Sequence, residues 1–423
     1  MRIHISRRWV IFFITCLLFV LSQFYRASVA VISPNLIADL NLDTRGLSLL
    51  SAAFFYAFAV MQIPVGLYLD SIGPRIAMTV LTLVAVAGAL LFALGESLAA
   101  LVTGRALLGI GMACNLMGTL KLITLWFGPL RFATLSALVI AVGTAGNIAA
   151  ATPLVLMVQA VGWRMTFVIL AGINLLFALL CFTVVRDRPE TLPGGTSVAE
   201  VSARPGEVFA GVKALFREKD YWIISLGTFC RYGIYAAVQA LWAGPYLMEV
   251  IGVSQVSAGN LLFLMSIGLI AGSPFSGWLS DAWIRSRKPV VVGGLLGMFL
   301  VLGLLARLET GSGCFTLGVL FFGFGFFSSG GQVMYAHIKE RMPIERAGTA
   351  MTGINFFTMT GGAVFLQGLG NLMERLHPGA SLGPAAFRAS FLFCAGCLAV
   401  TALLYLMTKE TLGRNSRRPS CRA

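Results

Sequence analysis

The sequence predicts an all-α membrane protein with twelve transmembrane helices, arranged as two pseudo-symmetric six-helix bundles. Hydrophobic residues make up 58% of the 423 residues and charged residues only 11%, which is too apolar for a soluble domain of this size. Twelve apolar segments are each long enough to cross a bilayer. The two halves of the chain also share residues at a nearly constant offset, which indicates an internal repeat.

The segments follow one another with short polar connections, except at one place. They are expected at residues 9–33, 46–69, 76–95, 98–121, 132–157, 164–185, 220–248, 258–280, 289–307, 314–337, 347–370 and 387–408. Residues 186–219 form the long exception, rich in Pro, Gly, Ser and charge, which is typical of a linker. The predicted organisation is therefore a first bundle at 1–185, a cytoplasmic linker at 186–219, a second bundle at 220–410 and a basic cytoplasmic tail at 411–423.

The internal repeat has an offset of 211 residues. It carries Pro34 near the end of the first segment to Pro245 near the end of the seventh. The same offset carries Gly66 to Gly277 and Asp70 to Asp281 at the ends of the second and eighth segments. In duplicated six-helix halves of this kind, substrate sites lie between the halves near the middle of the bilayer, and transport proceeds by rocking.

Lys and Arg residues set the expected orientation. With a cytoplasmic N-terminus, the cytoplasmic segments hold 22 of them, the opposite loops hold 5, and 4 lie inside spans. This excess places both termini in the cytoplasm of a multi-pass protein of the cytoplasmic (inner) membrane. The net charge of +14 thus reflects topology and contact with the lipid bilayer, and it requires no nucleic-acid partner.

The four basic residues inside spans are Arg26, Arg105, Lys121 and Arg231. All seventeen Asp and Glu residues lie in loops or at span ends, so no carboxylate pairs with these cations within the membrane. A buried intramembrane cation is costly and is usually functional. Its counter-group must be a backbone carbonyl, water or a bound anion, and we expect Arg26 and Arg231 to bind an anionic group of the substrate.

Span seven carries polar and aromatic side chains at helical spacing. Tyr232, Tyr235 and Gln239 fall on one face, which Trp242 continues. This stripe would suit a small polar ligand in a cavity, or equally packing between helices. Asn147 in span five is the further candidate for substrate contact.

Gly66-Leu-Tyr-Leu-Asp70-Ser-Ile-Gly73-Pro74-Arg75 resembles the signature loop of the major facilitator superfamily, and Gly277-Trp-Leu-Ser-Asp281 is a degenerate second copy. The stretch from Gly104-Arg105 to Gly111 is similar to the fourth-span motif of that family. The resemblance implies the major facilitator fold and a loop that latches the cytoplasmic side. We assign gating or conformational roles, with the glycines expected to allow close helix approach, to Gly66, Asp70, Gly73, Arg75, Arg105, Gly277 and Asp281.

Phe24-Tyr25-Arg26-Ala27-Ser28 and Cys230-Arg231-Tyr232-Gly233 resemble the anion:cation symporter and organophosphate antiporter branch, in which such arginines bind the anionic group of the substrate. Two positions depart from the proton-coupled members. Tyr25 stands where they usually have an Asp, and Met112 stands near their fourth-span Glu. Proton symport through that pair is therefore not supported.

The predicted function is secondary active transport of a small organic anion (a carboxylate, sugar acid or organophosphate) by alternating access, with import favoured. The coupling partner would be a proton or an exchanged anion, and the protein would act as a monomer. The alternatives are a proton-driven exporter of drugs or amphipathic metabolites, and a membrane sensor without transport activity. The sequence contains no phosphate loop, zinc-ligand spacing or nucleophile constellation, so neither an enzyme, a cofactor nor a metal site is predicted.

Overall fold

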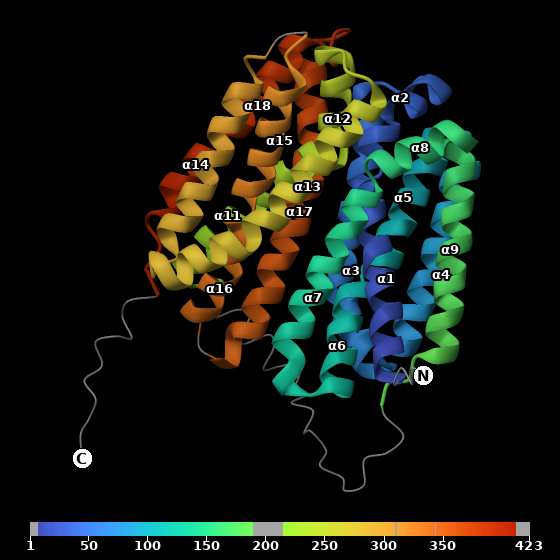
Figure 1. Ribbon diagram of the computed structural model, residues 1–423, viewed down its shortest axis with the longest axis vertical. Coiled ribbons are helices and arrows are strands. Elements are labelled where there is room, and N and C mark those ends of the chain that lie inside the picture. Colours follow the sequence, from blue (N-terminus) through green and yellow to red (C-terminus); the bar gives the residue numbers. More distant parts are fainter. Residues whose placement is uncertain (1–6, 189–214, 309–310, 343, 412–423) are drawn as a thin grey trace, which may run out of the picture.

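The computed structural model of the protein describes residues 7–188, 215–308, 311–342 and 344–411. Long, nearly parallel helices form two groups that lie side by side (Figure 1). Much of the predicted linker 186–219 and nearly all of the tail 411–423 lie outside the described residues. Within the described residues, ten helices are long and apolar enough to cross a membrane, and the bent pair α7–α8 would be an eleventh span. The remaining expected span corresponds to α17, a continuous helix whose glycines, threonines and amides make it less apolar than the others.

In the part of the first half that the structure describes, nine helices make up the six expected spans. They are α1 (Arg7–Ala27) and α2 (Val29–Leu40), α3 (Thr44–Ser71), α4 (Gly73–Leu94), α5 (Leu98–Met112) and α6 (Asn115–Phe127), α7 (Pro129–Ala149) and α8 (Thr152–Val161), and α9 (Trp163–Val184).

The second half repeats this pattern, with wide π-helical turns in spans seven and eight. Its elements are α11 (Lys219–Ala237), η1 (Val238–Trp242), α12 (Ala243–Pro245) and η2 (Tyr246–Ile251), α13 (Gln255–Trp278) and η3 (Leu279–Trp283), α14 (Lys288–Leu305), α15 (Cys314–Ser328) and α16 (Gly331–Arg341), α17 (Ile344–Leu376), and α18 (Pro384–Tyr405).

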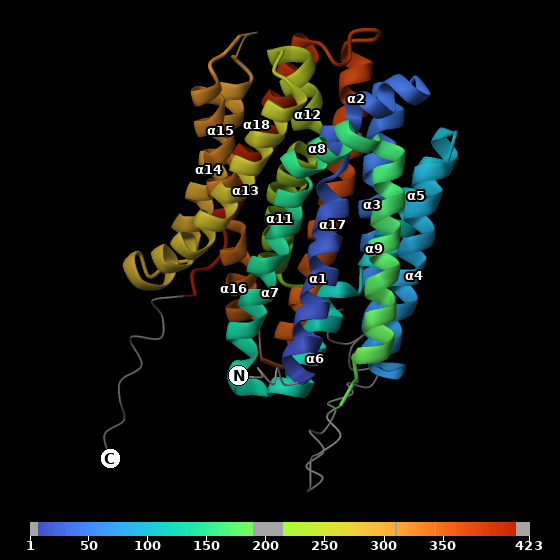
Figure 2. The same ribbon diagram turned by 45° about the vertical axis from the view of Figure 1, so that its right-hand side comes forward.

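Between the described residues, the larger contacts that join the halves involve three pairs of spans. Span one packs against span seven through α2, η1 and α12; α3 packs against α17; and α7 and α8 pack against α13. The first of these contacts is so close that a Cβ atom on Gly244 would lie 1.9 Å from the Ala30 carbonyl oxygen. Only glycine fits there, and both views show α2, α8 and α12 together at the end opposite the start of α1 (Figures 1 and 2).

Several spans are broken inside the predicted membrane segment. A break frees backbone carbonyls that the hydrocarbon core cannot hydrate, so protein groups must bond them. Arg105 donates to the carbonyl of Tyr25 at the break in span one, at 2.8 Å. Gln62 donates to Ala113 in span four at 3.3 Å, and Arg231 donates to Ser328 in span ten at 3.1 Å. Buried polar side chains therefore stabilise these breaks.

Candidate functional site

Arg26 lies in the last turn of α1, one residue before the helix ends. Its Nη1 donates a hydrogen bond to the hydroxyl of Tyr232 at 3.0 Å. The guanidinium also lies over the ring of Phe58, with Cζ 4.7 Å from the ring centroid, while the buried Nε has no hydrogen-bond partner in the described part of the chain. Because Tyr232 belongs to α11, this contact joins the two halves.

Arg231 precedes Tyr232 on α11 and lies against the break between α15 and α16. Its Nη1 donates to the Ser328 carbonyl at 3.1 Å and to the Ser328 hydroxyl at 3.4 Å. Its Cζ is 5.6 Å from the centroid of the Tyr232 ring. The residue is 7% exposed, and its Nε is a further buried donor with no partner among the described residues. Arg26 and Arg231 are thus brought to the same tyrosine.

The guanidinium of Arg231 rests on Gly331, the first residue of α16. A Cβ atom at position 331 would lie 2.1 Å from both Cζ and Nε of Arg231. Any other side chain there would displace the guanidinium. The sequence pattern gave no indication of this role, because Gly331 is one of 47 glycines and its partner is 100 residues away.

The other predicted residues of span seven separate into two groups. Tyr235 stacks on Phe324, with centroids 6.2 Å apart, and its hydroxyl is buried with no partner among the described residues. Gln239 donates to the Ser266 hydroxyl at 3.3 Å, and the Trp242 indole donates to the Leu366 carbonyl at 3.1 Å. Tyr232 and Tyr235 are therefore near the arginines, whereas Gln239 and Trp242 bond neighbouring helices.

Asn147 is buried on α7, a helix that packs against α1, α6 and α13. The structure does not bring it into hydrogen-bond contact with Arg26 or Arg231 in the described part of the chain. Tyr335, which the sequence analysis did not select, lies on α16 four residues after Gly331, the residue against which the Arg231 guanidinium rests. Its hydroxyl is also 3.0 Å from that of Thr358.

Arg105 is fully buried behind span one and does not line the space between the halves. Besides its bond to the Tyr25 carbonyl, its guanidinium lies 5.0 Å from the ring centroid of Phe54. The Tyr25 hydroxyl accepts a hydrogen bond from Asn174 at 2.7 Å. Arg105 and Asn174 thus hold Tyr25 from two sides, and with it the backbone next to Arg26.

The signature loop of the first half joins α3 to α4. Gly73 has a φ of +82°, which a residue with a side chain rarely adopts, and the Asp187 carboxylate lies directly against it. Asp187 accepts the Arg75 amide at 2.8 Å, and Arg75 Nε donates to the Phe182 carbonyl at 2.8 Å. The backbone of Asp70 lies in the last turn of α3, and its side chain lies outside the described residues. Among the described residues, no atom lies within 4 Å of a Cβ placed on Gly66, so no close helix approach is seen at that glycine.

The matching loop of the second half holds a larger ionic cluster. Arg287 bonds Asp281 and also Glu340, the latter at 2.6 Å. Glu410, just after α18, accepts the amides of Arg287 at 2.9 Å and Lys288 at 3.1 Å, as well as the Ser286 hydroxyl.

Partial burial works against the charged form of Glu410. The hydrogen bonds from Ser286 and from backbone amides outweigh it and lower the pKa of Glu410 to about 2. Asp187 after span six and Glu410 after span twelve thus bind the starts of α4 and α14 in the same way, a symmetry that the sequence analysis missed. In the described part of the chain, no atom lies within 4 Å of a Cβ placed on Gly277 either.

Three polar contacts join the halves at the end opposite the start of α1. Gln255 donates to the Val31 carbonyl at 2.6 Å and to Asn35 at 3.1 Å. The other two pair Thr152 with Asn260 and Thr44 with Ser381, each at 2.6 Å. Together these contacts form a seal of uncharged groups at this end, which we call the polar seal.

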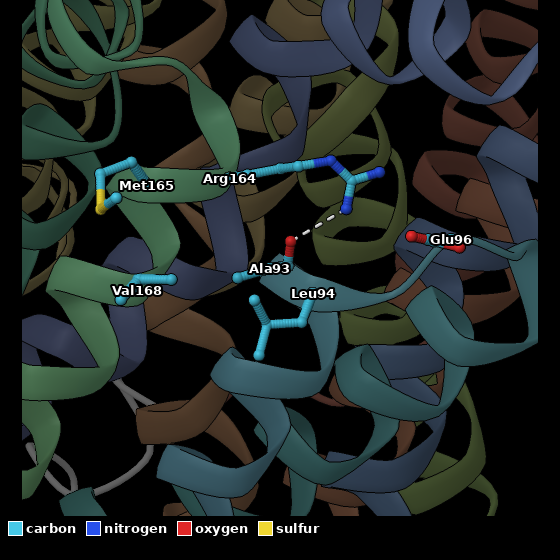
Figure 3. Close-up of a pocket in the computed structure, with 6 residues that line it drawn as sticks. All are labelled: Ala93, Leu94, Glu96, Arg164, Met165 and Val168. Carbon is cyan, nitrogen blue, oxygen red and sulfur yellow. Dashed lines mark hydrogen bonds between the residues drawn. The ribbon is translucent and has the colours of Figure 1, made fainter.

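A cavity of about 380 Å³ lies in the first half, lined by residues at the end of α4 and the start of α9 (Figure 3). Arg164 at its mouth is already bonded to Asp39 at 2.9 Å and to the carbonyls of Ala93 and Gly95. Its cation is compensated by the protein itself. The cavity is therefore a poorer candidate for anion binding than the region of Arg26 and Arg231.

Comparisons with known proteins agree with this architecture. The D-galactonate transporter of Escherichia coli O6:H1 is 24% identical over 414 residues, covering 90% of this chain and 91% of that protein. The hexuronate transporter of Bacillus subtilis is 24% identical over 397 residues, covering 91% and 90%.

Among solved structures, a bacterial homologue of the human lysosomal transporter Spinster, in an inward-facing and unoccupied conformation, has a TM-score of 0.76. It is 18% identical and covers 95% of this chain and 97% of that one, a likeness that shows the fold alone. The model of the Major Facilitator Superfamily matches residues 14–366 and 224–420. The fold and transporter relatives confirm the interpretation as a multi-pass membrane transporter. The chain belongs to the major facilitator superfamily.

Proposed function

We propose that this transporter moves a small organic anion by alternating access, and that Arg26 and Arg231 bind the anionic group. The observation that carries the proposal is the position of the two guanidinium groups at one tyrosine between the halves, while the Asp and Glu residues lie in loops or near the ends of the expected spans. Each has a buried Nε without a partner among the described residues. A carboxylate or phosphate offers the acceptors that these donors lack.

The relatives support the chemical class of the substrate. Two of them are named for galactonate and hexuronates, which are sugar acids. Tyr232, Tyr235, Gln239, Trp242 and Asn147 remain proposed as substrate-contacting residues, with Tyr232 and Tyr235 best placed by their position beside the arginines.

The coupling that the chemistry favours is exchange of one anion for another. Moving an empty carrier between its two states would leave the arginine charges without a counter-ion in a medium of low polarity, which is costly. Proton symport needs a titratable group that changes charge with the transport cycle. Tyr25 and Met112 are both fully buried and do not supply a carboxylate.

The proposal extends to topology and gating. We propose an inner-membrane protein with cytoplasmic termini, on the basis of the distribution of Lys and Arg. We also propose that it acts as a monomer and that import is the favoured direction. The two loop clusters, at Gly66, Asp70, Gly73 and Arg75 and at Gly277 and Asp281, would lie on the cytoplasmic side and control opening there. Arg105 would contribute by holding the backbone next to Arg26.

The test is counterflow in proteoliposomes. Proteoliposomes that contain the purified protein are loaded with unlabelled d-galactonate, d-glucuronate or glucose 6-phosphate, and entry of the labelled compound from outside is measured. Arg26→Ala and Arg231→Ala are each expected to lower kcat/KM about ten- to a hundredfold, because each loses a charged hydrogen bond worth about 1.5–3 kcal/mol. Arg388→Ala, on the exposed face of α18, is the matched control.

Uptake of lipophilic cations that is unaffected by both arginine variants would overturn the proposal and support the exporter. Binding of sugar acids without any flux would support the sensor.

A further inference from the structure

The hydrogen bond between Arg26 of α1 and Tyr232 of α11 joins the two halves at the proposed substrate site. The polar seal lies at one end of the molecule and contains no charged group. The bond from Arg26 Nη1 to the Tyr232 hydroxyl also joins the halves, but it differs from the polar seal because it involves one of the proposed substrate-binding cations. It therefore connects the proposed site to the relative position of the halves.

Tyr232 stands between the two cations. Its hydroxyl accepts from Arg26, while its ring is beside Arg231. Phe58 covers the guanidinium of Arg26 at 4.7 Å and restricts its orientation. An anion that bonds Arg26 end-on, through Nη1 and Nη2, takes the acceptor position on Nη1 that the phenol oxygen now occupies, and the ring then has to turn away.

We propose that Tyr232 is an internal competitor of the substrate. Its hydroxyl occupies on Arg26 the position of a substrate oxygen, and the bound anion displaces it and releases the bond between the halves. The inference rests on the proposed function, because it needs an anionic substrate at Arg26. It refines the substrate contact proposed above for Tyr232: a residue that only supports the bound substrate raises the affinity, whereas a competitor lowers it.

The exchange is favourable for an anion. Hydrogen bonds between a guanidinium and a charged oxygen are roughly twice as strong as those between neutral groups, and a carboxylate or phosphate can also bond bidentately. A neutral phenol makes the weaker bond. In the empty site, the phenol hydroxyl nevertheless accepts one hydrogen bond of Arg26. Breaking that bond lowers the net free energy of substrate binding, as for any ligand that selects a minor conformation.

The decisive variant is Tyr232→Phe, which keeps the ring and removes the hydroxyl. Equilibrium binding of d-galactonate, d-glucuronate and glucose 6-phosphate to the purified full-length protein is measured by titration calorimetry. For whichever of these the wild type binds, Kd is expected to fall about three- to tenfold, because the net free energy of one hydrogen bond no longer opposes binding. Tyr56→Phe, two residues before Phe58 and more than one-third exposed, is the matched control with unchanged Kd.

A Kd that rises in Tyr232→Phe would identify Tyr232 as a ligand and overturn the inference while leaving the proposed function intact. An unchanged Kd would also overturn it. If the wild type binds none of the three anions, the proposed function itself fails.

A second measurement does not depend on a ligand. Thermal unfolding of the unliganded wild type, Arg26→Gln, Tyr232→Phe and the double variant forms a double-mutant cycle. The two changes are expected to be non-additive, since either one removes the same bond. Additive shifts in unfolding temperature would show that the bond is absent from the empty transporter, and would overturn the inference whatever the binding data.

Discussion

Gly331→Ala tests directly whether the position of Arg231 matters. The added Cβ would lie 2.1 Å from Cζ and Nε and 2.3 Å from Nη2 of Arg231, whereas ordinary contact begins at 3.4 Å. The guanidinium must therefore move by about 1 Å or more. The backbone at Gly331 needs no positive φ, and the atoms that meet the new methyl group are the mobile end of a long side chain. The fold is expected to tolerate the change with little loss of stability.

The displaced guanidinium would lose its present alignment with the Ser328 carbonyl, now at 3.1 Å, and with an anion placed between the halves. Losing one charged hydrogen bond costs about 1.5–3 kcal/mol, or a factor of ten to a hundred in affinity. We expect KM for the transported anion to rise at least tenfold in the proteoliposome assay, with the amount of folded protein unchanged.

Gly330→Ala is a close control for this experiment. A Cβ at position 330 meets its nearest atoms, the Val290 and Phe327 carbonyl oxygens, at 3.4 and 3.5 Å, which are ordinary contacts. It changes the same turn by one methyl group without touching Arg231. Wild-type KM in Gly331→Ala, or an equal defect in both variants, would refute the reasoning that Gly331 positions the arginine.

Two further predictions concern other parts of the molecule. Glu410 has a lowered folded-state pKa, so its contribution to stability is present above the usual value of 4.5 and is lost as the pH falls toward about 2. The difference in unfolding temperature between wild type and Glu410→Gln is therefore expected to shrink from pH 6 to pH 3, and a constant difference would contradict the assignment. In the polar seal, Thr152→Cys with Asn260→Cys is expected to form a disulfide that stops counterflow until it is reduced, because the two side chains are 2.6 Å apart and must separate when that end opens. Full transport by the cross-linked protein would show that the contact persists through the cycle.

The membrane class and the two-half organisation could be predicted from the sequence because both are encoded locally. Apolar length determines which segments enter a bilayer, and a duplicated chain keeps its motifs at a constant spacing. The pairing of Gly66 and Asp70 with Gly277 and Asp281 needed no coordinates. Arg26 and Arg231 could be selected for the same reason, since a charge inside an apolar run is visible from composition alone.

The stripe on span seven shows where periodicity stops being sufficient. Regular α-helical spacing places Tyr235, Gln239 and Trp242 on one face, but the chain widens into π-helical turns from Val238. Gln239 then bonds Ser266 and Trp242 bonds the Leu366 carbonyl. A change in the number of residues per turn rotates every later side chain about the helix axis, and the preferences of single residues do not predict such a change.

The sequence by itself determined that this chain crosses a membrane many times, that its two halves are related, and that cations without acidic partners lie within its spans. Only the tertiary structure decided what the three arginines within the spans contact. Arg105 donates to the Tyr25 carbonyl in span one, Arg231 donates to the Ser328 carbonyl at the break in span ten, and Arg26 donates to the Tyr232 hydroxyl of the opposite half. The physical reason is that hydrophobicity acts on each segment separately, whereas a hydrogen bond depends on positions within tenths of an ångström between residues up to 206 apart in the chain.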